Sequence, residues 1–466
     1  MLPAIDPWFS AFVAADVAWC TYLPTRRLAE VRARRLALLL RASAQRSPLY
    51  RRILRGRNPD TVRLEELPIV SKAELMHSFE RWVGDGEIRI RELREFTAER
   101  DLIAEPFLGR YTVWESSGSG GGEPGIYVQD AAAMAVYDAL EAVRRIALRP
   151  GARLIDPFWL SERIVFLGAT SGHFASAVSF ERIRRLNPQL AARLRSVSIL
   201  QSLNKQIAEL DDFQPTVVAT YPSVAVLLAE ECDAGRLSIA PQEIWTGGET
   251  LTVNMRALIE KAFKCPVVNS YGASEFLTLA SQCRYGALHL NSDWAIVESV
   301  DEDGRLVPSG TQGASVLLTN LANHVQPLIR YDLTDSVTLH SGSCACGSSL
   351  PVIEIQGRGD DTLHLVGDSD QPVRVVPLAV ATVLEEEAGL FDFQVVQRGP
   401  RDVALHTGLL GEAAAAALTQ AKAALGAYLG RQGAQNVQIH CYGGAPAKLG
   451  TSGKMRRVLG MPCKNG

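Results

Sequence analysis

The first residues that could do chemistry form a glycine- and serine-rich run at 116–125, SSGSGGGEPG. Small residues let the backbone approach a ligand closely and adopt positive φ. Consecutive amide groups, with Gly118 and the hydroxyls of Ser116, Ser117 and Ser119, could therefore hold a polyphosphate. The run lacks the Gly-Lys-Ser/Thr ending of a Walker motif, so we interpret it as a phosphate loop of another kind, with a flexible surface turn as the alternative.

Three cysteines and one histidine form a second candidate site. Cys283 precedes His289 by five intervening residues, and Cys344 and Cys346 lie in the run SCACG. Thiolates and imidazole are the ligands of tetrahedral structural Zn²⁺, and Gly347 allows a tight turn beside the cysteine pair. Four protein ligands leave no open position, so we expect a structural ion and no zinc-dependent catalysis. Three unrelated thiols and a surface histidine are the alternative, because C-x-C is a loose motif.

The elements that would position these residues follow an α/β pattern. Short β-branched runs alternate with helical stretches between about residues 110 and 320. The expected strands lie at 217–220, 243–246, 266–269 and 315–319, and the expected helices at 131–147, 222–234 and 252–263. We also expect that the glycine-rich run precedes a helix that begins near Gln129. Alternation of this kind predicts a large, layered α/β body.

The two ends of the chain carry further signals. An amphipathic helix is predicted at 26–47, and Ser71 and Glu74 have the spacing of a capping box that begins another helix. After about residue 357 the pattern changes to short strands around two helices, at 377–388 and 411–427. The expected strands there are PVRVV, FQVVQ, VALHT and NVQIH. This pattern predicts a separate small α+β domain.

Composition narrows the class of protein. A chain of 466 residues with 47% hydrophobic and 21% charged residues predicts a soluble protein of at least two domains, since no segment approaches about 20 consecutive apolar residues. A net charge of −3 without long runs of one sign argues against nucleic-acid or membrane partners, so we expect small-molecule partners. The first 20 residues have no basic residue before their apolar stretch and contain two aspartates, which argues against a secretory signal. Five scattered cysteines suit a reducing, cytoplasmic location: Cys20, Cys232, Cys265, Cys441 and Cys463.

Further segments follow the glycine-rich loop in a fixed order. They are WTGGETLTVNMRALIEKAF (245–263), VVNSYGASEF (267–276), QPLIRYDLTDSV (326–337), IQGRGDD (355–361) and KLGTSGKMRRV (448–458). Together they resemble the adenylate-forming acyl-CoA synthetase superfamily, and with RSPLYRRIL and LPIVSKAEL near the start they resemble its phenylacetate-CoA ligase and capsule-type branch. Similar cysteine clusters in this branch favour the zinc interpretation. The resemblance covers most of the chain and implies a large layered N-terminal domain with a small mobile α+β C-terminal domain.

The resemblance implies which residues hold the nucleotide. In this chain they are the loop residues Ser116, Ser117, Gly118 and Ser119, with Gly247, Gly248 and Glu249 at the adenine, Ser270, Tyr271 and Gly272 beside the nucleotide, Asp335 on the ribose, and Arg358. A carboxylate suits the ribose because it can accept from both hydroxyls. Glu275 would hold Mg²⁺, since a metal that bridges phosphate oxygens needs a carboxylate anchor.

The resemblance also implies catalytic and mobile parts. Lys454 would be the catalytic lysine, which neutralises charge that develops in the transition state. Asp360 would be the hinge between an N-terminal domain at 1–357 and a C-terminal domain at 358–466. The resemblance implies that the chain activates a carboxylic acid with ATP and passes the acyl group to coenzyme A, and an aromatic acid is the expected substrate. It also implies that the protein could be a homodimer.

The substrate pocket is predicted from three segments. GATSGHFAS (168–176) resembles a segment that lines the carboxylate pocket, which places His173 and Phe174 near the acid. The other wall candidates are Tyr137, Tyr221 and Ala273. Aromatic and small residues suit a flat aryl acid. A hydrogen-bonded structural role is the alternative for His173, and a core position is the alternative for Tyr137.

The candidate phosphate loop departs from the family pattern. The usual loop carries paired threonines and a lysine before its proline, whereas this chain has Gly120 and Gly121 at hydroxyl positions and Glu123 before Pro124. The loop is also one residue longer. Two alternatives therefore stay open: an adenylating enzyme that passes the acyl group to an amine or a carrier-protein thiol, and a non-catalytic nucleotide-binding relative. Retention of Lys454 argues against the second, because a binding module does not need it.

Overall fold

The computed structural model describes the chain over the ranges 6–116, 124–145, 161–342, 344–356, 362–444 and 456–461. Several predicted site residues lie outside these ranges. They are Ser117, Gly118, Ser119, Arg358, Asp360 and Lys454. Their roles, and the domain boundary near residue 358, stay predictions.

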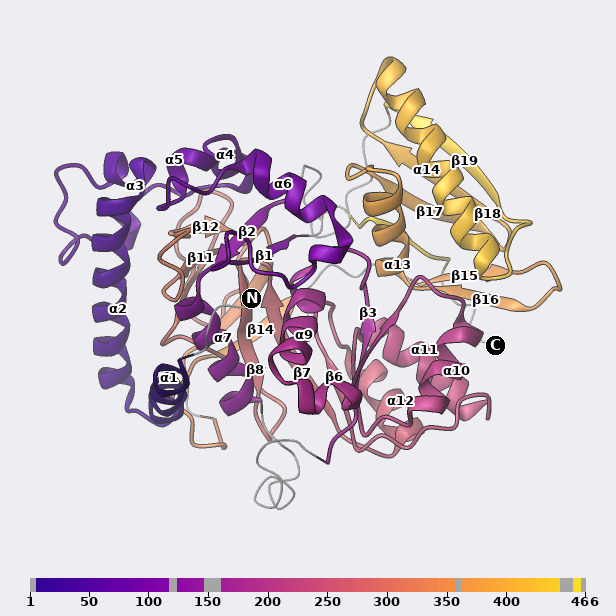
Figure 1. The fold of residues 1–466 in the computed structure, drawn as a ribbon, viewed down its shortest axis with the longest axis horizontal. Helices are drawn as coiled ribbons and strands as arrows, with labels where there is room; N and C mark the ends of the chain where they lie inside the picture. Colours follow the sequence, from indigo (N-terminus) through magenta and orange to yellow (C-terminus); the bar gives the residue numbers. More distant parts are fainter. Residues whose placement is uncertain are drawn as a thin grey trace.

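Helices form most of the first hundred residues and lie along one side and the top of the view in Figure 1. They are α1 Pro7–Cys20, α2 Thr25–Arg46, α3 Pro48–Ile53, α4 Lys72–His77, α5 Phe79–Trp82 and α6 Ile90–Ala98. Helix α2 confirms the amphipathic helix predicted at 26–47. The capping box is also confirmed, because the Ser71 hydroxyl accepts from the Glu74 amide at 3.3 Å and the Glu74 carboxylate accepts from the Ser71 amide at 2.8 Å.

A nine-stranded mixed sheet forms the centre of the molecule, in the order β13-β14-β9-β8-β7-β6-β5-β3-β4. Its strands are β3 Ile164–Gly168, β4 Leu194–Ser198, β5 Val217–Thr220, β6 Glu243–Thr246, β7 Val267–Ala273, β8 Phe276–Gln282, β9 Leu288–Leu290, β13 Ser336–His340 and β14 Val352–Gln356. The half from β4 to β7 is parallel, and the half from β7 to β13 is antiparallel. Strand β7 is therefore where the pairing changes direction.

The predicted alternation of strands and helices is confirmed in this body. The helices are α7 Ala131–Arg144, α9 Ala175–Leu186, α10 Leu203–Phe213, α11 Pro222–Asp233 and α12 Val253–Phe263. A smaller sheet contains β10 Ala295–Val300, β11 Ser315–Asn320 and β12 Tyr331–Asp332. None of the helices in the described ranges has the length and apolar character needed to cross a bilayer.

The helix expected to begin near Gln129 is confirmed as α7, but a short strand that precedes it was missed. The chain first forms β2 Ile126–Gln129, which pairs antiparallel with β1 Thr112–Glu115. Helix α7 then begins at Ala131, because the Asp130 carboxylate caps it by accepting from the Ala133 amide at 2.8 Å. The run that we interpret as a phosphate loop therefore connects two strands of a hairpin.

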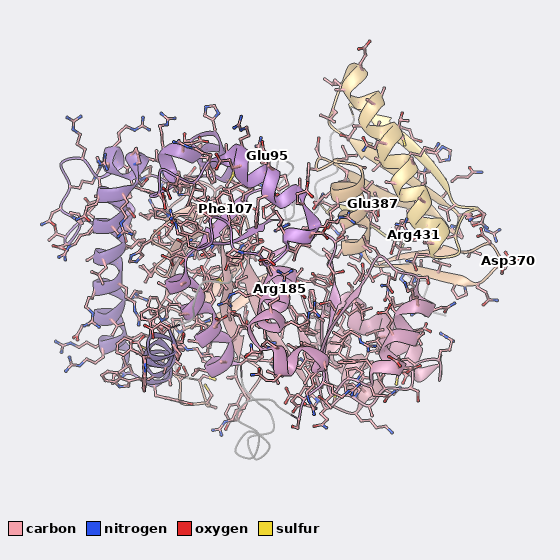
Figure 2. The ribbon with its side chains drawn as sticks, viewed as in Figure 1. Glu95, Phe107, Arg185, Asp370, Glu387 and Arg431 are labelled. Carbon is pink, nitrogen blue, oxygen red and sulfur yellow. The ribbon has the colours of Figure 1, made fainter. Side chains whose placement is uncertain are left out.

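The C-terminal elements form their own sheets at the upper right of Figure 1. They are β15 Leu363–Val366, β16 Pro372–Val375, α13 Pro377–Thr382, β17 Gln394–Gly399, β18 Asp402–Thr407, α14 Gly411–Arg431, β19 Gln438–Gly443 and β20 Val458–Leu459. The helix predicted at 377–388 continues beyond α13 as a π-helical turn, Val383–Glu387. Glu387 of this turn faces Arg431 at the end of α14, with 3.2 Å between carboxylate and guanidinium (Figure 2).

Two hydrophobic clusters hold the described chain together. The first joins the N-terminal helices to the antiparallel half of the central sheet, with Trp82, Trp114 and Tyr127 among its fully buried members. The second joins the parallel half to the C-terminal elements, so that residues such as Val165 and Leu384 belong to one cluster. The C-terminal sheets are therefore packed against the body in this structure, and not separated from it by solvent.

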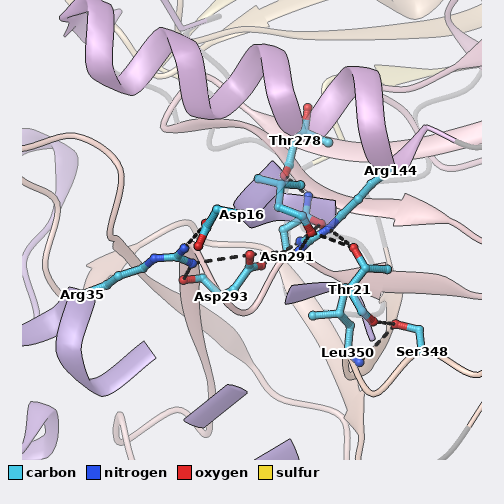
Figure 3. A network of polar contacts seen from close by, with 10 residues as sticks. Asp16, Thr21, Arg35, Arg144, Thr278, Asn291, Asp293, Ser348 and Leu350 are labelled. Atoms are coloured by element: carbon cyan, nitrogen blue, oxygen red, sulfur yellow. Dashed lines mark hydrogen bonds and ion pairs between the residues drawn. The ribbon is translucent and has the colours of Figure 1, made fainter. Parts of the chain in front are cut away.

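A buried polar network ties three helices to the loop after β9 (Figure 3). The Arg144 guanidinium of α7 donates to both carboxylate oxygens of Asp293, at 2.7 and 2.9 Å. Arg35 of α2 donates to the Asp293 carbonyl oxygen at 2.8 Å and also contacts Asp16 of α1. Asn291 accepts from Arg144 at 2.8 Å. The network fixes how α1, α2 and α7 approach the sheet.

Candidate active site

The candidate site lies where the parallel strands end. Tyr221 follows β5, Gly247 follows β6, and Ser270 lies in the last part of β7. The carboxyl ends of neighbouring parallel strands meet at one edge of a sheet, and ligands bind there when the strand order or direction changes. A cavity of about 2400 Å³ opens along this edge and extends to the C-terminal elements.

Most described residues of the predicted site line this cavity. They are Ser116, Tyr137, Phe174, Tyr221, Gly247, Gly248, Glu249, Ser270, Tyr271, Gly272, Ala273, Glu275 and Asp335. Segments up to 219 positions apart in the chain, from Ser116 to Asp335, therefore meet at one surface. His173 is the described member of the predicted set that the cavity wall does not include.

The glycine turn after β6 is held by its neighbours. Gly248 has φ +77°, a conformation that favours glycine, and a Cβ atom at this position would lie 3.0 Å from the Tyr221 ring. Glu249 accepts from the Ser223 amide and from the Ser223 hydroxyl, both at 3.0 Å. Glu249 thereby caps the start of α11, and it lines the cavity together with Gly247 and Gly248.

The carboxylate of Asp335 is held by a tyrosine. The Tyr271 hydroxyl donates to Asp335 Oδ2 at 2.8 Å, and burial followed by the Asp335 charge raises the tyrosine pKa well above its ordinary value. Gly272, next in the chain, permits the tight β7–β8 hairpin, since a Cβ atom there would lie 1.8 Å from the Leu277 carbonyl oxygen. Tyr271 and Asp335, predicted to lie at the nucleotide, are therefore joined directly.

Glu275 lies in the β7–β8 turn and is 9% exposed. Its Oε1 accepts from the Tyr127 hydroxyl at 2.5 Å and from the Tyr331 hydroxyl at 2.8 Å. Burial, with the Glu275 charge as the next cause, raises the pKa of both tyrosines, so both remain hydrogen-bond donors at neutral pH. These two tyrosines were missed from the sequence, although Tyr331 stands inside the segment QPLIRYDLTDSV.

The backbone of the Glu275 turn is also fixed. The Trp114 indole N–H donates to the Ser274 carbonyl oxygen at 2.7 Å, and the Asn320 side-chain amide donates to the Glu275 carbonyl oxygen at 2.9 Å. Trp114 comes from β1 and Asn320 from β11. Two separate strands therefore fix the backbone from which the Glu275 carboxylate extends.

The base of the glycine-rich loop is closed by two hydrogen bonds. The Ser116 amide donates to the Gly125 carbonyl oxygen at 2.8 Å, and the Ser116 hydroxyl accepts from the Gly125 amide at 2.9 Å. The Ser116 hydroxyl is thus engaged at the loop base, while its residue still reaches the cavity. This closure brings the ends of the candidate phosphate loop to the cavity edge.

The predicted acyl wall divides into three half-buried residues, Phe174, Tyr221 and Ala273, and two buried ones, His173 and Tyr137. Phe174 lines the cavity. His173 is 1% exposed, with Nε2 at 3.0 Å from the Glu99 carbonyl oxygen and its ring packed on Phe96, and burial lowers its pKa. Tyr137 accepts from the Asn320 amide at 2.9 Å and is 1% exposed, although its edge borders the cavity. This geometry favours the structural alternative for His173.

The candidate zinc ligands lie together. The ligand atoms of Cys283, His289, Cys344 and Cys346 all lie within 4.8 Å of one another. Cys283 Sγ is 3.8 Å from Cys344 Sγ, and Cys346 Sγ is 3.4 Å from His289 Nε2. Two thiolates at about 2.3 Å from a tetrahedral zinc would be about 3.8 Å apart, which is the separation observed. His289 Nδ1 lies 2.7 Å from the Leu350 carbonyl oxygen, so Nδ1 carries the proton and Nε2 is free to bind a metal.

Sequence comparison finds relatives for part of the chain. No family model matches it. A phenylacetate-coenzyme A ligase of Thermus thermophilus is 30% identical over 212 residues, which cover 43% of this chain and 46% of the relative. The protein CapK of Staphylococcus aureus is 32% identical over 143 residues, covering 30% of each chain. The chain thus spans less than half the length of these curated relatives.

Comparison with solved structures covers nearly the whole chain. A 2-hydroxyisobutyryl-CoA ligase in complex with 2-HIB-AMP and CoA in the thioesterification state gives a TM-score of 0.58 at 18% identity, over 95% of this chain and 91% of that one. An open conformation of the same ligase gives 0.55 at 19% identity, over 94% and 93%. This likeness concerns the fold. By sequence, over part of its length, the chain is similar to phenylacetate-CoA ligases and to CapK, and over nearly its whole length it has the fold of an adenylate-forming acyl-CoA ligase.

Proposed function

We propose that this protein activates a carboxylic acid with ATP as an acyl-adenylate and transfers the acyl group to coenzyme A. The observation that carries the proposal is the meeting of Glu275, Asp335 and the glycine turn at Gly247 and Gly248 along one cavity edge. One carboxylate that binds the metal, a second that binds the ribose and a backbone turn beside the adenine are the groups that hold a nucleotide with its phosphates toward a reacting acid. The named activity of the partial relatives supports the same reaction class.

The proposed reaction has two steps. A carboxylate oxygen of the acid attacks the α-phosphorus of ATP, the bond from that phosphorus to the bridging oxygen breaks, and pyrophosphate leaves. The sulfur of coenzyme A then attacks the acyl carbon, the acyl–phosphate bond breaks, AMP leaves and the thiol proton passes to solvent. Each step brings anions together, so positioned counter-charges are the main requirement.

The chain's own residues would supply these charges and positions. Asp335, held by Tyr271 at 2.8 Å, would accept from the ribose hydroxyls. Glu275 would hold Mg²⁺, whose chemistry when bound is to neutralise phosphate charge. Lys454, which lies outside the described residues, would stabilise the charge that builds up during the first step. Residues 117–119 would contact the phosphates, and Arg358 would contact the nucleotide.

The proposed domain rotation explains how one chain could serve both steps. We place a hinge at Asp360 between an N-terminal domain and a C-terminal domain that carries Lys454. The C-terminal elements form sheets of their own, which supports their motion as a unit. The 2-hydroxyisobutyryl-CoA ligase has been solved in states named postadenylation, open and thioesterification, and rotation would give this chain comparable states.

An aromatic acid is the substrate class that we favour. Phe174 and Tyr221 line the cavity, and aromatic rings favour flat apolar partners. The named substrate of the ligase relatives, phenylacetate, has the same character. The seven cysteines in the described ranges form no disulfide with one another, which suits the reducing cytoplasm that we propose as the location of the protein.

We further propose that Cys283, His289, Cys344 and Cys346 bind a structural zinc ion. Metal analysis should find one zinc per chain. Cys344→Ser should lose the metal and lower the melting temperature, whereas Cys441→Ser, which changes a half-buried thiol outside the cluster, should keep it. A zinc-free protein in which Cys344→Ser is fully stable would rule the site out.

ATP/pyrophosphate exchange against a panel of aryl and small aliphatic acids tests the function, with and without coenzyme A and with products identified by mass spectrometry. Lys454→Ala should abolish exchange while ATP binding persists, and Lys422→Ala, an exposed lysine of α14, should not. Acid-dependent exchange without a thioester would indicate an amine or carrier-protein thiol as acceptor. If no acid in the panel supports exchange, the proposal is contradicted, and a non-catalytic nucleotide-binding protein is the alternative that remains.

A further inference from the structure

The Glu275 carboxylate has an uneven environment. Both hydroxyl donors, from Tyr127 and Tyr331, meet the same oxygen, Oε1. Within the described part of the chain, Oε2 accepts no hydrogen bond and no guanidinium or ammonium pairs with the carboxylate. Glu275 also lines the cavity. The group is therefore oriented by neutral donors on one side and available to a ligand on the other.

Neutral donors and cationic donors have different consequences for a buried carboxylate. A guanidinium would cancel the charge, whereas a hydroxyl stabilises the ionised form and leaves the net charge of −1 in place. A carboxylate that keeps its charge in a mostly buried position attracts a cation strongly, because the local dielectric is low. The use of two tyrosines thus preserves the property that a metal ligand needs.

The hydroxyl geometry sets the direction of each hydrogen bond. The two tyrosine oxygens are 3.1 Å apart, and each hydroxyl has one proton. A carboxylate oxygen is the stronger acceptor, so both protons point to Glu275 Oε1. Both side chains are buried, with Tyr127 at 1% and Tyr331 at 3% exposure, so their surroundings are mostly protein. The three side chains form one rigid unit, which we call the tyrosine clamp.

We propose that Tyr127 and Tyr331 are positioning residues that hold Glu275 so that its second oxygen binds the magnesium ion of MgATP; this inference rests on the proposed function. The clamp joins three parts of the site. Tyr127 lies on β2 directly after the glycine-rich loop, Tyr331 lies four residues before Asp335, and Glu275 lies in the β7–β8 turn. Hydrogen-bonded partners of a metal ligand fix its orientation and tune its affinity.

Gly125 links the clamp to the base of the candidate phosphate loop. A Cβ atom at Gly125 would lie 2.7 Å from the Tyr127 hydroxyl, so only glycine leaves this hydroxyl its present place. Gly125 also pairs with Ser116 at the loop base. The position of the loop and the orientation of Glu275 are therefore set by adjacent contacts of the same short segment.

The test measures ATP binding by calorimetry in Mg²⁺ and again in EDTA, so that the ratio of the two affinities reports the metal contribution without turnover. The variants are Tyr127→Phe, Tyr331→Phe, the double variant and Glu275→Gln. Tyr50→Phe is the matched control, because Tyr50 is buried in the same hydrophobic cluster but its hydroxyl accepts from the Ile329 amide instead of contacting Glu275. Thermal melting checks that each variant is folded.

In the double variant, the ratio of ATP affinity in Mg²⁺ to ATP affinity in EDTA should fall about tenfold and approach the ratio measured for Glu275→Gln. The affinity for ATP in EDTA should stay unchanged. Each single variant should lose less, and Tyr50→Phe should match the wild type. If the double variant keeps the full gain while Glu275→Gln loses it, the clamp has no positioning role and the inference fails alone. If Glu275→Gln also keeps the gain, Glu275 is not the metal ligand. If the wild type binds no ATP, the proposed function fails with it.

Discussion

Two buried carboxylates, Asp293 and Glu275, lie within one body and have opposite surroundings. Asp293 is fully buried and receives a two-pronged contact from Arg144, at 2.7 and 2.9 Å, with Arg35 beside it (Figure 3). Glu275 is 9% exposed and receives two neutral tyrosine hydroxyls. The charge of Asp293 is cancelled inside the protein, while the charge of Glu275 is not.

The difference separates a structural role from a functional one. A buried carboxylate that is matched by guanidinium groups has no affinity left for a further cation, and removing it leaves buried positive charge. A buried carboxylate that is only hydrogen-bonded destabilises the free protein and gains from a bound metal. Functional sites are commonly the places where stability is not optimised. Substitutions of the two acids should therefore have opposite signatures.

Asp293→Asn should produce the largest change, a loss of about 3–5 kcal/mol in the free energy of unfolding, because Arg144 and Arg35 would stay buried without their shared partner. Urea unfolding followed by tryptophan fluorescence measures this. Asp402→Asn is the matched control: it removes a carboxylate 2.9 Å from Arg398 at the surface and should change stability by less than about 1 kcal/mol. Equal losses in the two variants would contradict the structural role of Asp293.

Glu275→Gln should reverse this pattern. The amide keeps an oxygen for both tyrosine donors and removes an uncancelled charge, so the melting temperature should stay the same or rise. The rate of ATP/pyrophosphate exchange should fall by about 10²–10³-fold, as when one preorganised electrostatic contact is removed from a transition state. A variant that is unstable yet active would show that Glu275 resembles Asp293 after all.

Much of the architecture behind this comparison could be predicted from the sequence. The strands β5 and β6 and the helices α2 and α11 follow the periodicity of apolar residues and lie within a few positions of their expected limits. The order of short segments around Gly247, Glu275 and Asp335 predicted residues that do line one cavity. Local pattern and ordered motifs were sufficient for these features because each depends on a short stretch of chain.

The tyrosine clamp could not be predicted in this way. Tyr127 and Tyr331 are 204 positions apart, and their contact depends on how β2 and β12 are brought together. Tyr127 looks like any apolar residue of a strand, and nothing local shows that its hydroxyl meets a carboxylate. Strand β2 was missed for a related reason, because the Ile126–Gln129 run forms a strand only by pairing with β1.

Tyr271→Phe extends the comparison to a third acid, Asp335, at which a single tyrosine donates at 2.8 Å. Loss of one hydrogen bond to a carboxylate should weaken ATP binding about five- to tenfold, which is about 1–1.4 kcal/mol. The effect should be the same in Mg²⁺ and in EDTA, since Asp335 would contact ribose and not metal. Titrations with ATP and with 2′-deoxy-ATP distinguish a ribose contact of Asp335 from a metal contact. If Asp335 contacts the ribose, the variant should bind both nucleotides almost equally. A change that depends on Mg²⁺ would instead place Asp335 at the metal.

Glu386 shows a third way to manage a buried carboxyl, which is to keep its proton. It belongs to the π-helical turn after α13 and packs on the loop after β3, where a Cβ atom at Gly172 would lie 3.3 Å from its Oε1. Burial raises its pKa to about 7, partly offset by Ser171 and Arg100 and reinforced by the charges of its neighbours Glu385 and Glu387. Docking of the C-terminal elements at this point therefore favours the protonated acid.

The sign of the expected pH effect follows from that shift. Because the docked pKa lies above the ordinary value, the contribution of Glu386 to stability is complete below about pH 4.5 and is lost as pH rises through about 7. Glu386→Gln should remove this loss and raise stability at pH 8 relative to the wild type, by about 1 kcal/mol or less because solvent partly screens the group. Melting temperatures from pH 5 to 8 measure it, with Glu387→Gln, the residue that faces Arg431, as the control for losing a charge from the same turn. A wild type and a Glu386→Gln variant with parallel profiles would show that this carboxyl does not take up a proton on docking.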